Sequence, residues 1–361
     1  MSRTETSLSV LAGQLLVSGL SAAEMSASER RTFASGERGG VVLFKRNLTR
    51  SIIDVAKLIA SVQSAMPLPA LVAVDQEGGR VVRLGPPALA LPAMRRLGNL
   101  GDADLLTRVA CAQAKELRAL GFTMSFSPVA DVHTRAENPI IGDRAFAETP
   151  EAVARFAGAW ADGLSQGGIL TCAKHFPGHG DTTGDSHLVL PRVERSQADL
   201  DRIEIAPFRA LARRPSIDAM MTAHVVYPSI DAEQPATLSR AICSDLLRTK
   251  LGFRGVLFSD DLEMKAISLS PGDAAISAIV AGCDVVLACS KAEVADEIHA
   301  ALTREAEGSS AFRARCEQAF ERAIAMRKRV APTPVTDAAL LAEIFAGSAP
   351  ISKELDRRLA G

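Results

Sequence analysis

Eight short apolar runs recur along the chain, and each is followed by a segment with a helical pattern. The runs span residues 15–17, 41–44, 71–74, 124–129, 169–173, 219–222, 256–258 and 285–288. They are rich in Val, Leu and Ile and do not alternate strictly with polar residues, which is typical of parallel strands covered on both faces. This repeated strand–helix pattern constrains the fold more than any other feature of the sequence.

The segments between the runs carry the period of amphipathic helices. Apolar stripes span residues 52–62, 105–120 and 156–164, and the second ends at Gly121, where a glycine commonly terminates a helix. Eight strand–helix units most economically close into a (β/α)8 TIM barrel of the α/β class. A doubly wound open sheet is the alternative, but the chain has no phosphate-loop signature that would favour it.

The domain organisation follows from this count. We expect one catalytic domain over residues 1–361, with the barrel over about 8–308 and a helical extension over about 309–361. Two helices are predicted in the extension, near residues 310–327 and 336–346, and Pro332 and Pro334 separate them. We expect this tail to pack around the barrel rather than to form a second domain.

Composition excludes several classes of protein. Lys and Arg total 41 against 42 Asp and Glu, so the net charge of −1 argues against a nucleic-acid-binding protein. No segment approaches the roughly 20 apolar residues that a membrane span requires, and residues 1–14 do not resemble a signal peptide. The six cysteines are dispersed and mostly lie within apolar runs, which indicates buried reduced thiols. A cytoplasmic enzyme fits these features.

Polar side chains follow five of the predicted strands at the point where each strand ends. They are Asp75, Asp131, the pair Lys174 and His175, His224, and the pair Asp260 and Asp261. The carboxyl ends of the strands of a TIM barrel meet at one face, which carries the active site. The sequence therefore predicts a shared polar pocket at that face.

The stretch over residues 174–187 is unusually dense in ionisable, glycine and proline residues. We interpret it as a loop over the strand ends, because a core element would not tolerate this composition. Asp185 and His187 lie two residues apart in it. A carboxylate this close can bond one imidazole nitrogen, fix the tautomer of the ring and raise its basicity.

These motifs resemble those of the family 3 glycoside hydrolases, and more narrowly the bacterial β-N-acetylhexosaminidases of cell-wall recycling. The matching stretches span residues 75–80, 138–146, 174–187, 221–224 and 258–262. The resemblance covers most of the chain, from about residue 15 to about residue 289. The stretch at 174–187 is its most specific part.

The resemblance implies a role for each catalytic group. Asp260 would be the nucleophile that forms a covalent glycosyl-enzyme, while Asp261 is better explained as a helix N-cap. His187 would be the general acid/base, with Asp185 as its partner, in place of the second carboxylate that most retaining glycosidases use.

Five further residues would hold the sugar, because ring hydroxyls need charged or bidentate partners. They are Asp75, Arg83, Arg144, Lys174 and His175. His224 and His179 are expected to support neighbouring groups, and His133 and His299 carry no functional signal.

The activity implied by the resemblance is hydrolysis of terminal N-acetylglucosamine from N-acetylglucosaminyl-1,6-anhydro-N-acetylmuramic acid and its peptide forms. This would serve peptidoglycan recycling and, through it, cell-wall turnover, cell shape and cell division. We expect no cofactor, no metal ion, no nucleic-acid or membrane partner, and a monomer or weak dimer. The small disaccharide or muropeptide substrate is the one partner expected.

Three alternatives remain at this point. A family 3 β-glucosidase is the nearest, although such relatives usually carry a large second domain for which this chain has no length. A catalytically silent sugar-binding barrel is the second. The third is a zinc-dependent hydrolase, with a site drawn from the following side chains. They are His175, His179, Asp181, His187 and His224.

Overall fold

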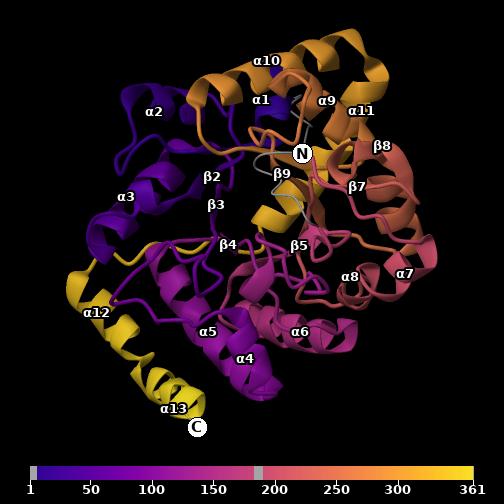
Figure 1. Ribbon diagram of the computed structural model, residues 1–361. Helices are drawn as coiled ribbons and strands as arrows, with labels where there is room; N and C mark the ends of the chain where they lie inside the picture. Colours follow the sequence, from indigo (N-terminus) through magenta and orange to yellow (C-terminus); the bar gives the residue numbers. More distant parts are fainter. Residues whose placement is uncertain (1–5, 183–189, 361) are drawn as a thin grey trace.

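The computed structural model describes residues 6–182 and 190–360, and its centre is a closed barrel of eight parallel strands (Figure 1). The strands are β1 (Leu16–Gly19), β2 (Gly40–Leu43), β3 (Leu71–Val74), β4 (Met124–Ser125), β5 (Leu170–Phe176), β6 (Ala219–Thr222), β9 (Val256–Asp261) and β10 (Val285–Ala288). Their order around the barrel is β1-β10-β9-β6-β5-β4-β3-β2, and β1 pairs with both β10 and β2 to close it. The prediction of a (β/α)8 barrel is confirmed.

Three predicted strand ends were wrong by three or four residues, and one of them is that of β9, which runs to Asp261 rather than to residue 258. Strand β4 ends at Ser125, and Val129 adds only an isolated bridge to Lys174, because Pro128 interrupts the run and has no N–H to donate. Strand β5 runs on to Phe176, so Lys174 and His175 belong to the strand and not to the loop that follows it. This position matters for function because barrel strands are held more rigidly than loops.

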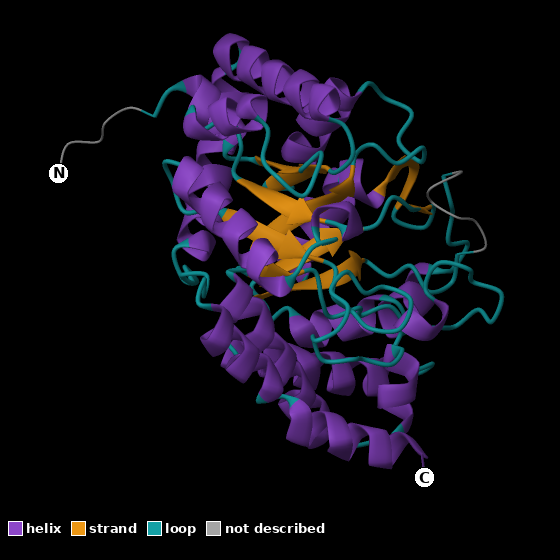
Figure 2. Cartoon of the chain, turned by 90° about the vertical axis from the view of Figure 1, so that its left-hand side faces the viewer, coloured by secondary structure: helices purple, strands orange, loops and turns teal. Residues whose placement is uncertain are grey.

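Helices lie around the barrel in Figure 1, and Figure 2 shows that loops gather at the right-hand side of the strands. The helices of the barrel region are α1 (Leu8–Gly13), α2 (Ala27–Ala34), α3 (Ile52–Ala65), α4 (Met94–Asn99), α5 (Ala103–Leu120), α6 (Pro150–Gln166), α7 (Gln197–Arg202), α8 (Ile205–Leu211), α9 (Pro271–Ala281) and α10 (Ala292–Gly308). Local sequence sets their ends. Ser51 caps the start of α3, and Gly121 ends α5 with a left-handed φ of 98°.

Several shorter elements lie between the strands and helices. They are the 3-10 turns η1 (Lys45–Asn47), η2 (Gly142–Arg144) and η3 (Ala236–Leu238), the π-helix η4 (Ala241–Lys250), and the antiparallel strands β7 (Val226–Tyr227) and β8 (Asp231–Pro235). The small β7–β8 sheet was not predicted, because its outward-facing strand β8 is polar and carries no apolar run.

The C-terminal region packs against the barrel and its helices. Helix α11 (Ser310–Arg327) places Ala323 and Met326 against the apolar side chains that fill the barrel interior. Helices α12 (Ala338–Ala346) and α13 (Ala349–Ala360) lie along α5 at the lower left of Figure 1. The positions of α11 and α12 agree with the prediction, whereas α13 was missed. Within residues 6–182 and 190–360, no helix has the length and apolarity to cross a membrane.

Candidate active site

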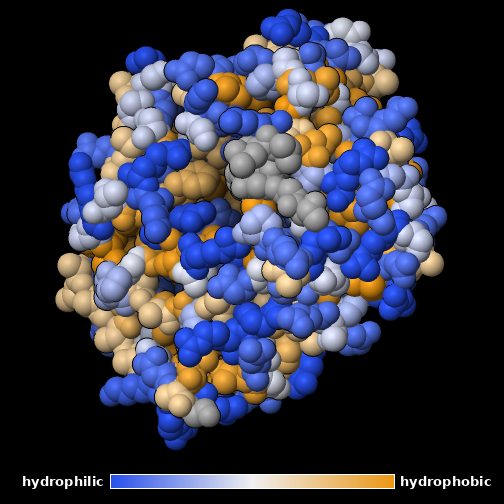
Figure 3. All heavy atoms as spheres, viewed as in Figure 1, coloured by the Kyte–Doolittle hydropathy of each residue, from blue (hydrophilic) through white to orange (hydrophobic). Residues whose placement is uncertain are grey.

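A cavity of about 330 Å³ opens at the carboxyl ends of the barrel strands. It lies on the face seen in Figure 3, where the surface is hollowed near the centre. Its volume falls in the range of small-ligand sites. Its lining consists of Val42, Phe44, Asp75, Glu77, Arg80, Val81, Arg83, Phe126, Ile140, Arg144, Lys174, His175, His179, Met221, Asp260, Asp261, Met264, Leu287 and Cys289. The predicted shared pocket at the strand ends is present in the structure.

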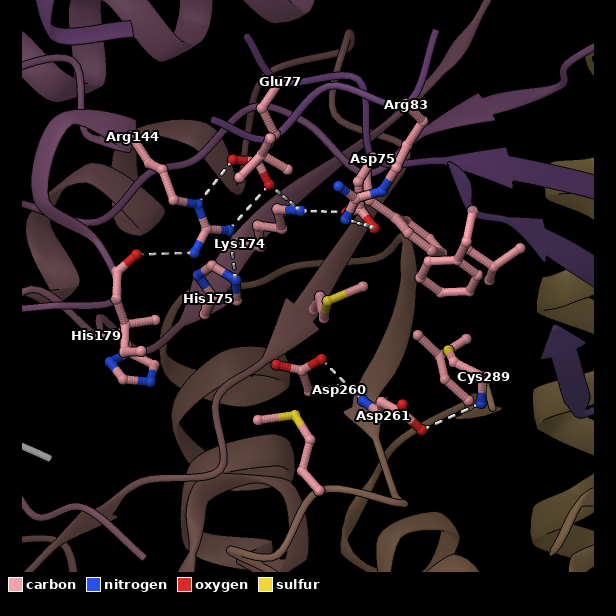
Figure 4. Close-up of a pocket in the computed structure, with 18 of the residues that line it drawn as sticks. Asp75, Glu77, Arg83, Arg144, Lys174, His175, His179, Asp260, Asp261 and Cys289 are labelled. Carbon is pink, nitrogen blue, oxygen red and sulfur yellow. Dashed lines mark hydrogen bonds and ion pairs between the residues drawn. The ribbon is translucent and has the colours of Figure 1, made fainter. Parts of the chain in front are cut away.

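One side of the cavity is a network of buried charges (Figure 4). The Lys174 ammonium donates to Asp75 Oδ1 at 2.6 Å and lies 2.6 Å from Glu77 Oε1. Arg144 donates to both carboxylate oxygens of Glu77, at 2.8 and 2.9 Å. Burial alone would raise the pKa of Glu77, but the two cations hold it well below its usual range. Burial would lower the pKa of Lys174, and the carboxylates of Asp75 and Glu77 raise it instead.

Arg83 completes this side of the cavity. Its guanidinium lies 3.6 Å from Asp75 Oδ2 and 5.8 Å from the ring centre of Phe44. The five residues expected to hold the sugar therefore lie around one cavity. Glu77, which binds two of them, was missed as a site residue. Its position two residues after Asp75, at the end of β3, was the available signal, because residues at that spacing in an extended segment point the same way.

A buried carboxylate orients His175. Asp131 is fully buried and accepts from His175 Nδ1 at 2.7 Å and from the backbone N–H of His179 at 2.7 Å. Burial would raise the pKa of Asp131, but the neighbouring His175 lowers it. Because the carboxylate accepts from Nδ1, the Nε2 atom of His175 faces the cavity, 3.4 Å from Arg144 Nη2. The strand-end aspartate Asp131 thus supports the site from behind.

Asp260 and Asp261 lie across the cavity from the charged network (Figure 4). Asp260 Oδ1 accepts the backbone N–H of Asp261 at 2.8 Å. Burial would raise the pKa of Asp260, but His224, His175, this N–H and Lys174 together lower it. Burial raises the pKa of Asp261 to about 7. The pKa values of two adjacent, chemically identical side chains therefore differ, and Asp260 is the one whose surroundings favour the ionised carboxylate.

The interpretation of Asp261 as a helix N-cap was wrong. Strand β9 runs to Asp261, and the next helix, α9, is capped by Ser270. Asp261 Oδ1 instead accepts the backbone N–H groups of Glu263 at 3.1 Å and Cys289 at 3.2 Å. It ties the end of β9 to the end of β10.

The predicted acid/base pair, Asp185 and His187, lies outside the described residues. The segment that precedes this pair is fixed by hydrogen bonds as far as Thr182. Asn138 Nδ2 donates to the carbonyl of His179 at 2.9 Å and to the Thr182 hydroxyl at 3.2 Å.

The remaining histidines separate into two groups. His224 is fully buried beside Asp260 and Asp261, and His179 is buried next to His175, which agrees with supporting roles. Burial lowers the pKa of His179 to about 4. His133 and His299 do not line the cavity. In the described part of the chain, no three His, Cys, Asp or Glu side chains are grouped so as to hold a metal ion.

Comparison with known proteins decides the family. The glycosyl hydrolase family 3 N-terminal domain matches residues 7–326. The chain belongs to glycoside hydrolase family 3. A β-hexosaminidase of Neisseria meningitidis serogroup C is 40% identical over 293 residues, which cover 79% of this chain and 80% of the relative. A β-hexosaminidase of Tolumonas auensis is 41% identical over 271 residues, or 74% and 80% of the two chains.

Solved structures of the family superimpose on this chain. A family 3 β-N-acetylglucosaminidase from Paenibacillus matches with a TM-score of 0.87 at 35% identity, over 96% of this chain and 69% of its own. NagZ from Neisseria gonorrhoeae, in complex with N-trifluoroacetyl-D-glucosamine, matches with a TM-score of 0.76 at 33% identity, over 94% and 98%. These family 3 relatives show that the chain is a glycoside hydrolase of the β-hexosaminidase group.

Proposed function

We propose that this family 3 enzyme is a retaining exo-β-N-acetylglucosaminidase with Asp260 as its nucleophile. The observation that carries the proposal is the position of an ionised Asp260 across a sugar-sized cavity from a wall of fixed charges. A retaining glycosidase needs a carboxylate that attacks the anomeric carbon from one side while the sugar is held in place.

The charged wall suits the hydroxyl groups of a pyranose. Asp75 accepts hydrogen bonds, whereas Arg83, Arg144 and Lys174 donate them, and Nε2 of His175 faces the same space. These side chains are already paired with one another, so they are held in position before the sugar arrives. A substrate without the matching hydroxyls would leave the remaining donors and acceptors of these side chains without partners.

The chemical steps follow from this placement. The Asp260 carboxylate forms a bond to the anomeric carbon as the glycosidic bond breaks, and His187 gives a proton to the departing oxygen. Asp185 holds the His187 ring in the required tautomer. In the second step His187 takes a proton from water, whose oxygen attacks the anomeric carbon and releases Asp260. The sugar leaves with its original β configuration, and both residues return to their starting protonation states.

Asp261 is unsuited to the role of nucleophile. Burial raises its pKa to about 7, so a large fraction of it is neutral at neutral pH, and its Oδ1 is occupied by two backbone N–H groups. A nucleophilic carboxylate must be ionised to attack. The surroundings therefore favour Asp260.

We assign the substrate from the relatives. They are named as β-hexosaminidases or β-N-acetylglucosaminidases, and one is bound to an N-acylated glucosamine. The proposed substrate is N-acetylglucosaminyl-1,6-anhydro-N-acetylmuramic acid with or without its peptide, cleaved in the cytoplasm during peptidoglycan recycling. The described cysteines are all free thiols, which suits a reducing compartment. We further propose a monomer or weak dimer that needs neither nucleic acid nor membrane.

One assay separates this function from its nearest alternative. Hydrolysis of an aryl N-acetyl-β-glucosaminide should exceed hydrolysis of the matching aryl β-glucoside. A preference for the glucoside would identify a β-glucosidase, and the absence of both activities would indicate a sugar-binding barrel. Asp260→Ala should abolish turnover while the protein stays folded. A fluorinated sugar that traps the intermediate should label Asp260, and a label on Asp261 would contradict the assignment.

A further inference from the structure

His224 lies directly behind the proposed nucleophile and is fully buried. It follows β6, and its ring reaches the end of the neighbouring strand β9. Its Nε2 atom is 3.0 Å from the backbone carbonyl oxygen of Asp261. A carbonyl oxygen can only accept, so Nε2 carries a proton and donates to it.

This contact fixes the residue that follows the nucleophile. The carbonyl of Asp261 is held by His224, and its backbone N–H donates to Asp260 Oδ1 at 2.8 Å. The side chain of Asp261 is anchored at the same time by the N–H groups of Glu263 and Cys289. Residue 261 therefore has little freedom to turn, and its N–H stays directed at the Asp260 carboxylate.

Two buried hydroxyl groups hold the other side of the imidazole. Thr237 Oγ1 lies 2.7 Å from His224 Nδ1, 2.8 Å from Thr222 Oγ1 and 3.2 Å from the carbonyl oxygen of Ala223. The hydroxyl of Thr237 has one proton to give. The carbonyl oxygen of Ala223 can only accept, so the hydroxyl of Thr237 donates to it. Nδ1 of His224 then donates to Thr237 Oγ1, so both ring nitrogens carry a proton and the ring is cationic. Thr237 thus supports a positive charge behind the nucleophile.

We propose that His224 is a positioning residue for the glycosidase reaction. It holds the backbone that binds Asp260, and it supplies positive potential that keeps Asp260 a carboxylate. The proposal rests on the assignment of Asp260 as the nucleophile. It accounts for the last residue of the motif at residues 221–224, because Met221 lines the cavity whereas His224 does not.

Electrostatics supports this role. The ionisable groups that face Asp260 in the described structure are Lys174, His175, His179, His224 and Asp261, together with the buried thiols of Cys172 and Cys289. Burial raises the pKa of Asp260, and His224 is the strongest of the groups that lower it. Loss of His224 therefore raises the pKa of Asp260. The nucleophile is then protonated at a higher pH, and the acid limb of the rate profile moves upward.

The test measures kcat/KM for an aryl N-acetyl-β-glucosaminide against pH. His224→Ala removes both the N–H donor and the charge, so kcat should fall by about tenfold or more with little change in KM. The acid limb should move to higher pH. His224→Gln keeps an N–H donor without the charge. We expect it to show the same shift of the acid limb with a smaller loss of kcat.

A second pair of variants covers the possibility that His224 substitutions prevent folding. Thr237→Val removes the hydroxyl at constant shape and should move the acid limb in the same direction, whereas Thr237→Ser should keep the wild-type profile. An unchanged acid limb in folded His224→Gln, or in Thr237→Val where the His224 variants do not fold, would overturn the proposal. Trapping on Asp260 in the wild type is measured separately, so failure of the nucleophile assignment would be recognised by itself.

Discussion

Removal of Glu77 should destabilise the protein and disorganise the sugar site together. The side chain is 1% exposed and accepts from Arg144 at 2.8 and 2.9 Å, with Lys174 at 2.6 Å. In Glu77→Ala, Lys174 keeps Asp75 as a partner, but Arg144 loses its carboxylate inside the protein. Breaking a buried ion pair by removing one partner costs about 3–5 kcal/mol, and we expect the loss here to fall in that range.

Urea unfolding followed by fluorescence provides the measurement. The sequence has a single tryptophan, Trp160, which is fully buried and so reports on unfolding without a label. Glu194→Ala is the matched control, because Glu194 pairs with Arg192 at the surface, with side chains 69% and 47% exposed. Such an exposed pair contributes at most about 1 kcal/mol.

The effect on activity has the same origin. Without Glu77, the Arg144 guanidinium keeps only its contacts with the carbonyl oxygen of Ile140 at 3.2 Å and with His175 Nε2 at 3.4 Å. These do not replace the bidentate carboxylate, and a misplacement of about 1 Å can lower a rate by about 100-fold. We expect kcat/KM for the aryl glucosaminide to fall by that order in Glu77→Ala and to stay unchanged in Glu194→Ala. The reasoning is refuted if the two variants differ in unfolding free energy by less than about 1 kcal/mol, or if Glu77→Ala keeps wild-type kinetics.

Three further outcomes are expected. Glu204 is fully buried and burial raises its pKa to about 7, so its ionisation lowers the free energy of unfolding as pH rises from about 4.5 through about 7. Glu204→Gln should remove this decline and stabilise the protein above pH 7 by about 3 kcal/mol in urea unfolding, whereas the same pH dependence of unfolding free energy in both proteins would disprove it. His187→Ala should slow cleavage of the natural sugar–sugar bond more than glycosyl-enzyme formation from a nitrophenyl substrate, because only the sugar oxygen needs protonation to leave. Equal losses of pre-steady-state rate on the two substrates, with no burst, would place the proton donor elsewhere. Activity should survive a strong chelator, because the proposed steps use side chains alone, and a loss restored by added metal would revive the zinc alternative.

The sequence by itself determined the architecture of this protein. Apolar runs of the right length fix eight strands, and local signals such as the Ser51 cap and Gly121 fix helix ends within a few residues. Polar residues directly after the runs were also sufficient to place the cavity. All of these are short-range properties, because a strand, a cap or a strand end depends mainly on its immediate neighbours in the chain.

The family resemblance, and not the pattern of residues, identified Asp260 rather than Asp261 as the nucleophile. Nothing in two consecutive aspartates distinguishes them chemically. Their pKa values diverge in the folded protein because cationic side chains from β5 and from the end of β6 face Asp260, whereas burial dominates at Asp261. Such a difference depends on distances between distant parts of the chain.

Only the tertiary structure decided which groups support the site. Glu77 binds Arg144, 67 residues away, and Asp131 orients His175, 44 residues away. Closure of the barrel brings these partners together, and no local pattern records the pairing. The small β7–β8 sheet and helix α13 were missed for a related reason, since neither carries an apolar run of its own strong enough to identify it. Local sequence set where each element begins and ends, and closure of the barrel set which charges meet.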